Sequence, residues 1–548
     1  MAVPLILSAF THLWNVVGFP SIHVDEGYYL RRAMLVLQGK GPQESINDGH
    51  LHPYDHPYFG QIFLASLLKI VGYPSSVIAS NPSSSSTHAE IIQSIQMLYL
   101  VPRVLMGILA VVDTFLIYKI SELRYDRKVA FIASVLFGVM PLLWMLRRVY
   151  LDTILTPFLL SSILCALYYQ RPKTTNLSLK SYVPLILSGV FLGLAIFTKI
   201  PAIAIIPLVG FIIVCHNSNN NNNNNHENKN LKVLGLWFIP VVLIPLIWLG
   251  YSVSNGQFDL WLKDVMWQAH RHNAVLASVI ALFQVDLVFL ILGLAGTVFA
   301  AIRKDWFSVI WVGSFVIFFA AIGWVQYFHW IPVFPAFCIA AARMIEHISN
   351  KIDKIKDQKI LPQSYSWPYL IIITAIIGIF GLASTIMLIT TNVNASYFNI
   401  DSQIVQHISD NSKVTIIGSH WWIWNNLWVS QYIFHKNFDF IDPHFDPFFK
   451  KPVESQNVMF IVDRIFVHDT LLRNPFIITK TNFDSTNHIE RLSILYRNTY
   501  PVAYFIDSAL VSAGQRYNPY QYPYTSMQVM VENENRGQGL VQIRTNYH

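Results

Sequence analysis

Eleven long apolar segments constrain this chain more than any other feature of its sequence. They lie near residues 2–20, 96–120, 129–146, 152–170, 182–198, 200–216, 231–253, 276–301, 305–323, 328–345 and 367–390. A helix that crosses a bilayer needs about 20 mostly apolar residues. Only 13% of the residues are charged, whereas an ordinary soluble domain has roughly 25%. The sequence therefore predicts an α-helical polytopic membrane protein with about eleven transmembrane helices.

The loops between these segments alternate in charge, which predicts their sides. By the positive-inside rule the basic loops face the cytoplasm, so residues 21–95, 254–275 and the chain after 391 are expected outside. The net charge of +7 then reflects loop topology and gives no reason to expect nucleic acid as a partner. Asn394 is predicted outside and Asn176 inside. The basic set is Arg124, Arg127, Lys128, Arg171, Lys173, Lys180, Lys229, Lys232, Arg303, Lys304, Arg343, Lys351, Lys354, Lys356 and Lys359.

The last 150 or so residues differ from the rest. "SQIVQHISDNS" is typical of a helix, "KVTIIGS" and "NVMFIVDR" are typical of strands, and "SHWWIWNN" contributes the aromatic residues Trp421 and Trp422. Helices and strands in this order indicate a small α/β domain. We therefore expect a transmembrane domain at 1–392, with a first outer loop at 21–95, and an extracytoplasmic α/β domain at 393–548.

Charged and polar residues gather at the predicted outer ends of the spans. Charges near the membrane core are costly, so they are candidates for function. Carboxylates can act as a base, and cationic side chains can bind an anion, which together suit transfer of a group from a phosphate-bearing donor. The set is Asp25, Glu26, Asp55, His56, Arg103, Arg147, Arg148, Asp152, Lys199, Tyr327 and His329.

Structural explanations exist for several of these residues. A basic residue at the end of a span, such as Lys199 or Arg148, is often an interface anchor. Asp152 could pair with Arg147 or Arg148, and the pair Asp25–Glu26 could be the solvated start of a loop. Their joint placement on one side favours a functional interpretation.

The order "VDEGYY…YDHPYFGQ…PRVLMG…RRVYLD…GLAIFTK" resembles the GT-C membrane glycosyltransferases. It is most similar to the protein O-mannosyltransferases, the dolichyl-phosphate-mannose-protein mannosyltransferase family, and to the aminoarabinose transferases of bacterial lipid A. The matching elements are an acidic pair in the first outer loop, an acidic residue before a His-Pro turn, an Arg followed five residues later by Asp, and a Lys after "GLA". The resemblance covers about residues 10–345.

This resemblance implies an enzyme that moves a sugar, mannose or another hexose, from a polyprenyl or dolichyl phosphate to an acceptor hydroxyl, with inversion. The acceptor is a protein, a lipid or a glycan, and membrane lipid surrounds the enzyme. Asp25 is the expected base and Glu26 its support. Lys199 is the first candidate for the donor phosphate, with Arg103, Arg147 and His329 beside it. The expected acceptor or structural residues are Asp55, His56, Asp152 and Tyr327.

Two features of the chain leave the acceptor and the metal open. The loop 254–275 is too short for the β-trefoil insertion of eukaryotic protein O-mannosyltransferases. No obligatory divalent ion is expected, because fixed cations can stabilise the departing phosphate, although Asp55, His56, His270 and His272 could bind zinc. The expected location is the plasma membrane of an archaeon or bacterium, or the endoplasmic reticulum of a eukaryote, with the active site on the extracytoplasmic face. A transporter, or an assembly subunit that binds through its outer domain, is the alternative.

Overall fold

The fold comes from a computed structural model of the chain. It describes residues 1–43, 52–77, 88–170, 182–218, 226–271, 275–357 and 367–390. Beyond these it describes shorter pieces at 392, 394, 398, 401–402, 404–406, 408, 414–418, 428–436, 438–441, 457–462, 488–493 and 540–545. Asn176, His272, Trp421 and Trp422 lie outside the described residues.

Each of the eleven predicted apolar segments is helical, as expected for a multi-pass membrane protein. Among the described residues, five helices could cross a membrane by length and composition, or seven if two bent pairs each count as one span. The other segments are shorter apolar helices. The helices are α1 (Ala2–Leu13), α4 (His88–Arg124), α5 (Arg127–Val139), α6 (Leu151–Tyr169), α7 (Val183–Thr198), α8 (Ile206–Ser218), α9 (His226–Ser254), α11 (Val275–Val285), α12 (Leu287–Ile302), α13 (Trp306–Ile322), α14 (Phe334–Asp357) and α15 (Trp367–Ile389).

Three short 3₁₀ segments interrupt the helical bundle, and each contains a proline. They are η2 (Pro141–Arg147), η4 (Ile200–Ile205) and η5 (Tyr327–Val333). A proline removes a backbone donor and favours such breaks. η2 bends away from α5 by 70°. Because of these breaks, polar residues at the ends of apolar segments turn toward the interior.

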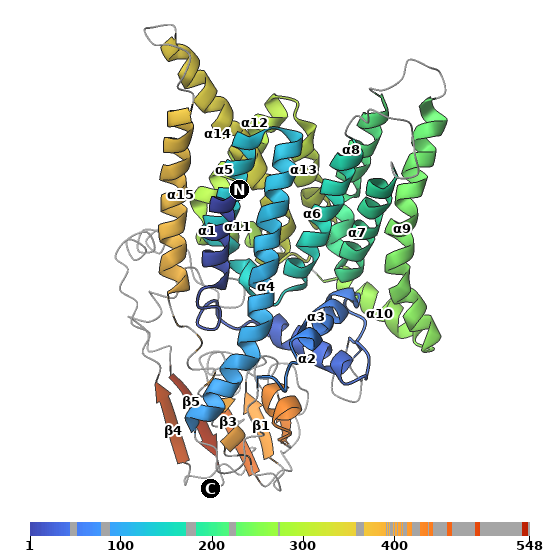
Figure 1. Ribbon diagram of the computed structural model, residues 1–548. Helices are drawn as coiled ribbons and strands as arrows, with labels where there is room; N and C mark the ends of the chain where they lie inside the picture. The colour runs from blue at the N-terminus through green and yellow to red at the C-terminus, as the bar shows by residue number, and fades with distance from the viewer. Residues whose placement is uncertain are drawn as a thin grey trace.

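Three further helices lie in the predicted outer loops, which the hydropathy pattern did not resolve. They are α2 (Val24–Leu37), α3 (Phe59–Ile70) and α10 (Phe258–Ala269). In Figure 1 all three lie at the lower end of the helical bundle, on the side of the C-terminal strands. They form a layer below the spans in which α3 is apolar and α2 and α10 carry polar and aromatic residues.

Helix α4 links the bundle to the C-terminal part of the chain. Its 37 residues extend about 55 Å at 1.5 Å per residue, well beyond a hydrocarbon core of about 30 Å. The excess reaches the C-terminal strands (Figure 1). There Tyr99 packs among Phe398, Val405 and Trp428, and the Trp428 indole donates to the Tyr99 hydroxyl at 3.1 Å.

The C-terminal strands form one mixed sheet with the order β2-β1-β3-β5-β4. β1 pairs with β2 and β3 in parallel, and β5 pairs with β3 and β4 in antiparallel fashion. Two of the strands coincide with the segments predicted as strands. The boundary between residues 392 and 393 stays a prediction. The bounds are β1 (Val414–Gly418), β2 (Phe438–Ile441), β3 (Asn457–Val462), β4 (His488–Ser493) and β5 (Leu540–Thr545).

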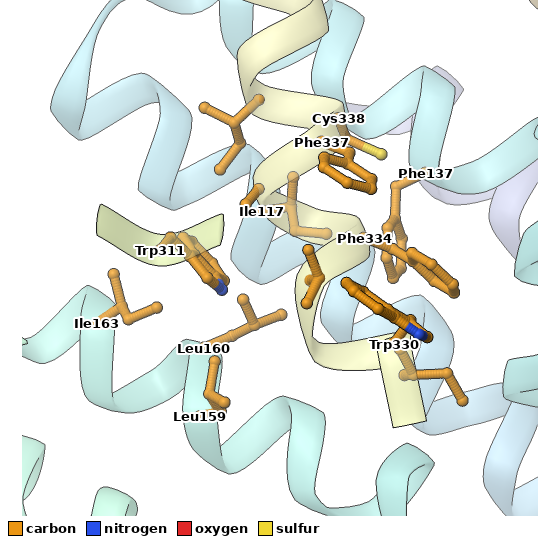
Figure 2. Packing of buried hydrophobic residues seen from close by; sticks show 14 of the residues in the cluster. Ile117, Phe137, Leu159, Leu160, Ile163, Trp311, Trp330, Phe334, Phe337 and Cys338 are labelled. Atoms are coloured by element: carbon orange, nitrogen blue, oxygen red, sulfur yellow. The ribbon is translucent and has the colours of Figure 1, made fainter. Parts of the chain in front are cut away.

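The main core joins the N-terminal and C-terminal halves of the bundle. Aromatic residues of η5 and α14, including Trp330, Phe334 and Phe337, pack against aliphatic residues of α4 and α6 (Figure 2). Small residues allow other helices to approach closely. A Cβ at Gly189 would lie 2.3 Å from a backbone oxygen of α9, so this α7–α9 contact requires glycine.

Candidate active site

A cavity of about 1000 Å³ opens where the outer-loop helices meet the ends of the spans. One part of its wall is apolar and comes from η4, α8, α9 and α13. The other part is polar and aromatic and comes from α2, α10, the loop before α3 and the segment around η5. The polar lining consists of Asp25, Tyr28, Tyr29, His52, Asp55, His56, Lys199, Trp267, Gln268, Arg271, Trp324, Gln326 and His329.

Asp25 faces this cavity because of the way α2 begins. The backbone N–H of Asp25 donates to the His23 ring at 3.3 Å, and the His23 N–H donates to the Glu26 carboxylate at 3.1 Å. This reciprocal cap fixes the first turn of the helix and sends the two acidic side chains in different directions. The Asp25 side chain keeps 30% of its surface exposed, whereas Glu26 is fully buried.

Glu26 lies outside the cavity lining and is bound by Arg103. The guanidinium donates from Nε at 2.9 Å and from Nη2 at 2.7 Å, one bond to each carboxylate oxygen. The Val149 N–H also donates to Glu26, at 3.3 Å. This paired, buried geometry ties α2 to α4. It favours a structural role for both residues, in place of the supporting catalytic role expected for Glu26 and the phosphate-binding role expected for Arg103.

Arg147, Arg148 and Tyr327 also lie outside the cavity lining. Arg147 donates to the carbonyl of Trp14 and is fully buried. Arg148 donates to the Tyr327 hydroxyl at 2.8 Å and to Ser21. These contacts hold the end of η2 against the first loop and η5. They favour structural roles, so the phosphate contact expected for Arg147 does not fit its position.

Lys199 reaches the cavity, but it already has a partner. Its ammonium lies 2.6 Å from Oδ2 of Asp152, and both side chains are almost completely buried. The pair joins the end of α7 to the start of α6. Asp152 therefore pairs with Lys199 rather than with Arg147 or Arg148 as the sequence suggested. Part of the positive charge of Lys199 is neutralised by this carboxylate before any donor binds.

Asp55 and His56 also line the cavity, beside α2. Arg32 lies 2.8 Å from Asp55, and the Tyr28 hydroxyl donates to the other carboxylate oxygen at 3.0 Å. Burial alone would raise the pKa of Asp55, but the Arg32 charge and the Tyr28 hydrogen bond lower it. Burial lowers the pKa of His56 to about 4. Asp55 is therefore ionised and His56 neutral at neutral pH.

His329 lies in η5 and also lines the cavity. Its Nδ1 accepts from the Gln326 N–H at 3.2 Å. That bond leaves Nε2 as the nitrogen that carries a proton in the neutral ring. His329 can therefore donate one hydrogen bond to an anion without carrying a charge.

Arg271 is one of the cavity residues that sequence analysis missed. Its guanidinium lies 3.7 Å from the ring centre of Trp324 and 4.7 Å from that of Trp267. Within the described part of the chain, no carboxylate lies within ion-pair distance of it. The neighbouring aromatic residues in "WQAHRHN" were the available signal, because arginine is commonly held against aromatic rings.

The residues considered as an alternative zinc site, Asp55, His56 and His270, belong to no group of three metal ligands among the described residues. His270 is exposed and contacts the backbone oxygen of Met266 at 2.7 Å. Asp55 is engaged by Arg32 and Tyr28, as described above. The positions of these residues therefore do not support a resident zinc ion.

Comparisons with known proteins find similarity to membrane glycosyltransferases, over part of the chain in sequence and over most of it in fold. Residues 49–255 match the model of the family described as dolichyl-phosphate-mannose-protein mannosyltransferase. None of the curated proteins compared matches the sequence. The archaeal oligosaccharyltransferase AglB from Archaeoglobus fulgidus, solved with an inhibitory peptide and a dolichol-phosphate, superimposes with a TM-score of 0.53 at 12% identity. That alignment covers 99% of this chain and 87% of AglB.

A second solved structure agrees with the first. ArnT from Cupriavidus metallidurans, bound to undecaprenyl phosphate, superimposes with a TM-score of 0.52 at 13% identity, covering 86% of this chain and 94% of ArnT. This chain has the GT-C fold. Another structure of the A. fulgidus enzyme contains Zn and sulfate and covers 99% of this chain and 88% of that enzyme, with a TM-score of 0.52 at 12% identity.

The GT-C fold confirms the resemblance and the fold class predicted from the sequence. The predicted acidic pair, the Asp-His-Pro turn and the lysine after "GLA" all lie near one cavity of this fold, although Glu26 points away from it. Together, the family match and the shared fold support a glycosyltransferase.

Proposed function

We propose that this GT-C protein transfers a hexose, with mannose as the first candidate, from a polyprenyl or dolichyl phosphate to an acceptor hydroxyl, with inversion at the anomeric carbon. One observation carries the proposal. A single cavity combines apolar walls from the spans with an accessible carboxylate, Asp25, and an arginine, Arg271, that has no carboxylate partner among the described residues. A base and a phosphate-binding cation are the two groups that this reaction needs.

The apolar wall suits the isoprenoid chain of the donor. Phe238 and Leu246 of α9 line the cavity and are 44% and 46% exposed. Ile203 of η4 likewise lines the cavity and is 38% exposed. Because this wall belongs to predicted membrane spans, a membrane-dissolved donor can place its isoprenoid chain there.

Arg271 is the best candidate for the donor phosphate. Its planar guanidinium can donate two parallel hydrogen bonds to a phosphate. The rings of Trp267 and Trp324 fix its plane, so little reorganisation is needed when a phosphate arrives. Lys199 is the second candidate for the donor phosphate, because Asp152 partly neutralises its charge. Neutral His329 can donate one further hydrogen bond to the phosphate.

Asp25 is the best candidate for the base. Burial raises the pKa of Asp25 to about 6, with Lys199 acting in the opposite direction. A carboxylate with that pKa is ionised at neutral pH and takes up a proton more readily than an ordinary aspartate. Burial is the main cause of the raised pKa of Asp25. The neighbouring Glu26 charge was expected to be that cause.

The proposed step is one displacement. The acceptor oxygen forms a bond to the anomeric carbon while the bond from that carbon to the phosphate oxygen breaks. The hydroxyl proton passes to Asp25, and the lipid phosphate leaves with the electron pair, stabilised by Arg271 and Lys199. No obligatory divalent ion is part of this step.

We also propose that the cavity opens on the extracytoplasmic side of the membrane, in an archaeal or bacterial plasma membrane or in an endoplasmic reticulum. The support is the charge asymmetry of the loops. Ser75 lies exposed beyond α3 in the first outer loop. In intact cells, a cysteine at this position should react with a membrane-impermeant thiol reagent. Labelling only after the membrane is opened would reverse the proposed sides.

The proposed reaction can be tested with purified protein in lipid nanodiscs and a panel of polyprenyl- and dolichyl-phosphate hexoses carrying a radiolabelled sugar. The acceptors are a serine–threonine peptide, an oligosaccharide and a hydroxylated lipid, each with and without EDTA. We expect one donor to lose its sugar to one acceptor, with EDTA causing no loss of rate. If no donor loses its sugar, the proposal is contradicted. If EDTA abolishes transfer, the metal-independent step is contradicted.

A further inference from the structure

A second polar unit on the cavity wall is not used by the proposed displacement. Nδ1 of His52 lies 2.9 Å from Oδ1 of Asp264. The other carboxylate oxygen accepts the Tyr54 N–H at 2.8 Å, and the Asp264 side chain is completely buried. Asp264 belongs to α10, whereas His52 and Tyr54 belong to the loop before α3. The carboxylate therefore fixes this loop against α10.

The contacts of His52 define which of its ring atoms remain available. A carboxylate oxygen accepts, so Nδ1 donates and carries the proton. In the neutral ring, Nε2 is then a hydrogen-bond acceptor. One ring face is stacked on Trp267, with centroids 3.8 Å apart and planes 12° apart. No other described residue forms a hydrogen bond to Nε2, and His52 lines the cavity.

The position of the His52–Asp264 pair in the chain indicates which substrate it contacts. Tyr54, His52, Asp264 and Trp267 all lie in the predicted outer loops, whereas the apolar wall for the donor lipid comes from membrane segments. An acceptor that arrives from water reaches the loop-borne wall of the cavity first. Trp267 also contacts Arg271, so the unit lies next to the candidate phosphate site.

We propose that His52, oriented by Asp264, forms an acceptor subsite in which Nε2 receives a hydrogen bond from a hydroxyl or amide N–H of the acceptor. This inference rests on the proposed function and adds a positioning site to it. Asp25 remains the base, and His52 holds the acceptor while its hydroxyl reacts. A serine–threonine peptide supplies both kinds of donor group and serves as the probe.

Two substitutions separate this role from simple packing. His52→Phe keeps a flat ring for stacking on Trp267 but removes the nitrogen. Asp264→Asn keeps the side-chain shape. Its oxygen can still accept the Tyr54 N–H, and its amide then donates to Nδ1, so the ring proton moves to Nε2 and the acceptor atom is lost. Asp264 is not part of the cavity lining, and Asn at this position keeps the Tyr54 bond, so a change in acceptor binding is expected to act through His52.

The experiment measures steady-state transfer to a fluorescent serine–threonine peptide by the full-length variants in nanodiscs. His52→Phe and Asp264→Asn should each raise the KM for the peptide by roughly five- to tenfold, the value of one hydrogen bond. The Kd for dolichyl phosphate should stay within about twofold, and the double variant should be no worse than either single variant. His270→Phe, at the exposed end of α10, is the matched control and should leave the KM unchanged.

The outcomes distinguish this inference from the reaction on which it rests. If the wild type transfers to the peptide and both variants keep its KM, the His52 subsite is wrong and the proposed function stands. If the wild type transfers to no acceptor, the proposed function fails and the subsite fails with it. If Asp264→Asn does not accumulate, His52→Gln decides, because its side-chain oxygen can still accept and should keep a lower KM than His52→Phe.

Discussion

Asn in place of Asp25 is expected to slow sugar transfer by about 10²–10⁴-fold, the usual contribution of a well-placed base. The substitution keeps the shape of the side chain, and the cap of α2 uses the Asp25 backbone N–H, so the variant should fold. Donor binding should persist because Arg271 and Lys199 are intact. Single-turnover transfer at equal protein abundance measures the effect. Asp259→Asn, in the first turn of the outer helix α10, is the matched control and should leave the transfer rate unchanged.

The pH dependence of transfer provides a second test of the same assignment. Because burial raises the pKa of Asp25 to about 6, the base form prevails above pH 6 and is lost as the pH falls below it. The wild-type rate should then fall about tenfold per pH unit on the acid side. The residual rate of Asp25→Asn should lack this decline. Near-normal transfer by Asp25→Asn would show that Asp25 is not the base and is only a solvated residue at the start of α2.

Alanine in place of Arg271 is expected to lower kcat/KM for the donor by about 10²–10³-fold. Removing one preorganised donor to a developing negative charge typically has an effect of this size. Arg271→Lys keeps the charge but loses the planar, doubly donating group, so it should recover only part of the rate. The measurement is transfer against donor concentration in nanodiscs. Lys263→Ala, on the exposed side of α10, controls for loss of a nearby positive charge.

Wild-type kinetics in Arg271→Ala would leave Lys199 as the phosphate ligand. Lys199→Ala is a less informative substitution, because it leaves the buried Asp152 carboxylate without its partner. Breaking a buried ion pair in this way typically destabilises a protein by about 3–5 kcal/mol. A loss of activity in that variant would therefore not distinguish phosphate binding from misfolding.

Hydropathy predicted the transmembrane helices because a bilayer imposes one requirement on every span, and that requirement is local in sequence. The same scan did not detect α2 and α10, whose apolar residues are interspersed with polar ones and whose partners are distant in sequence. The strands at 414–418 and 457–462 were predicted from short apolar runs. The pairing of β3 with β5, which comes from residues 540–545, joins segments about 80 residues apart, and no local pattern specifies it.

The sequence predicted which residues belong to the candidate site better than it predicted the contacts between them. Asp25 and Lys199 were recognised because each is a charge beside an apolar segment. Glu26 has the same local signal as Asp25, yet it pairs with Arg103, 77 residues away, and no local pattern specifies that pairing. Arg271 was missed for a related reason. Its importance depends on Trp324, which joins it only in the folded chain.

The proposed displacement is tested most directly by the anomeric configuration of the sugar product. Wild-type protein would transfer the sugar from a polyprenyl- or dolichyl-phosphate hexose of defined anomer, and NMR of the isolated product would assign its linkage. A single displacement with Asp25 as base predicts the anomer opposite to that of the donor. Retention of the donor configuration would contradict the mechanism, because it requires a second displacement.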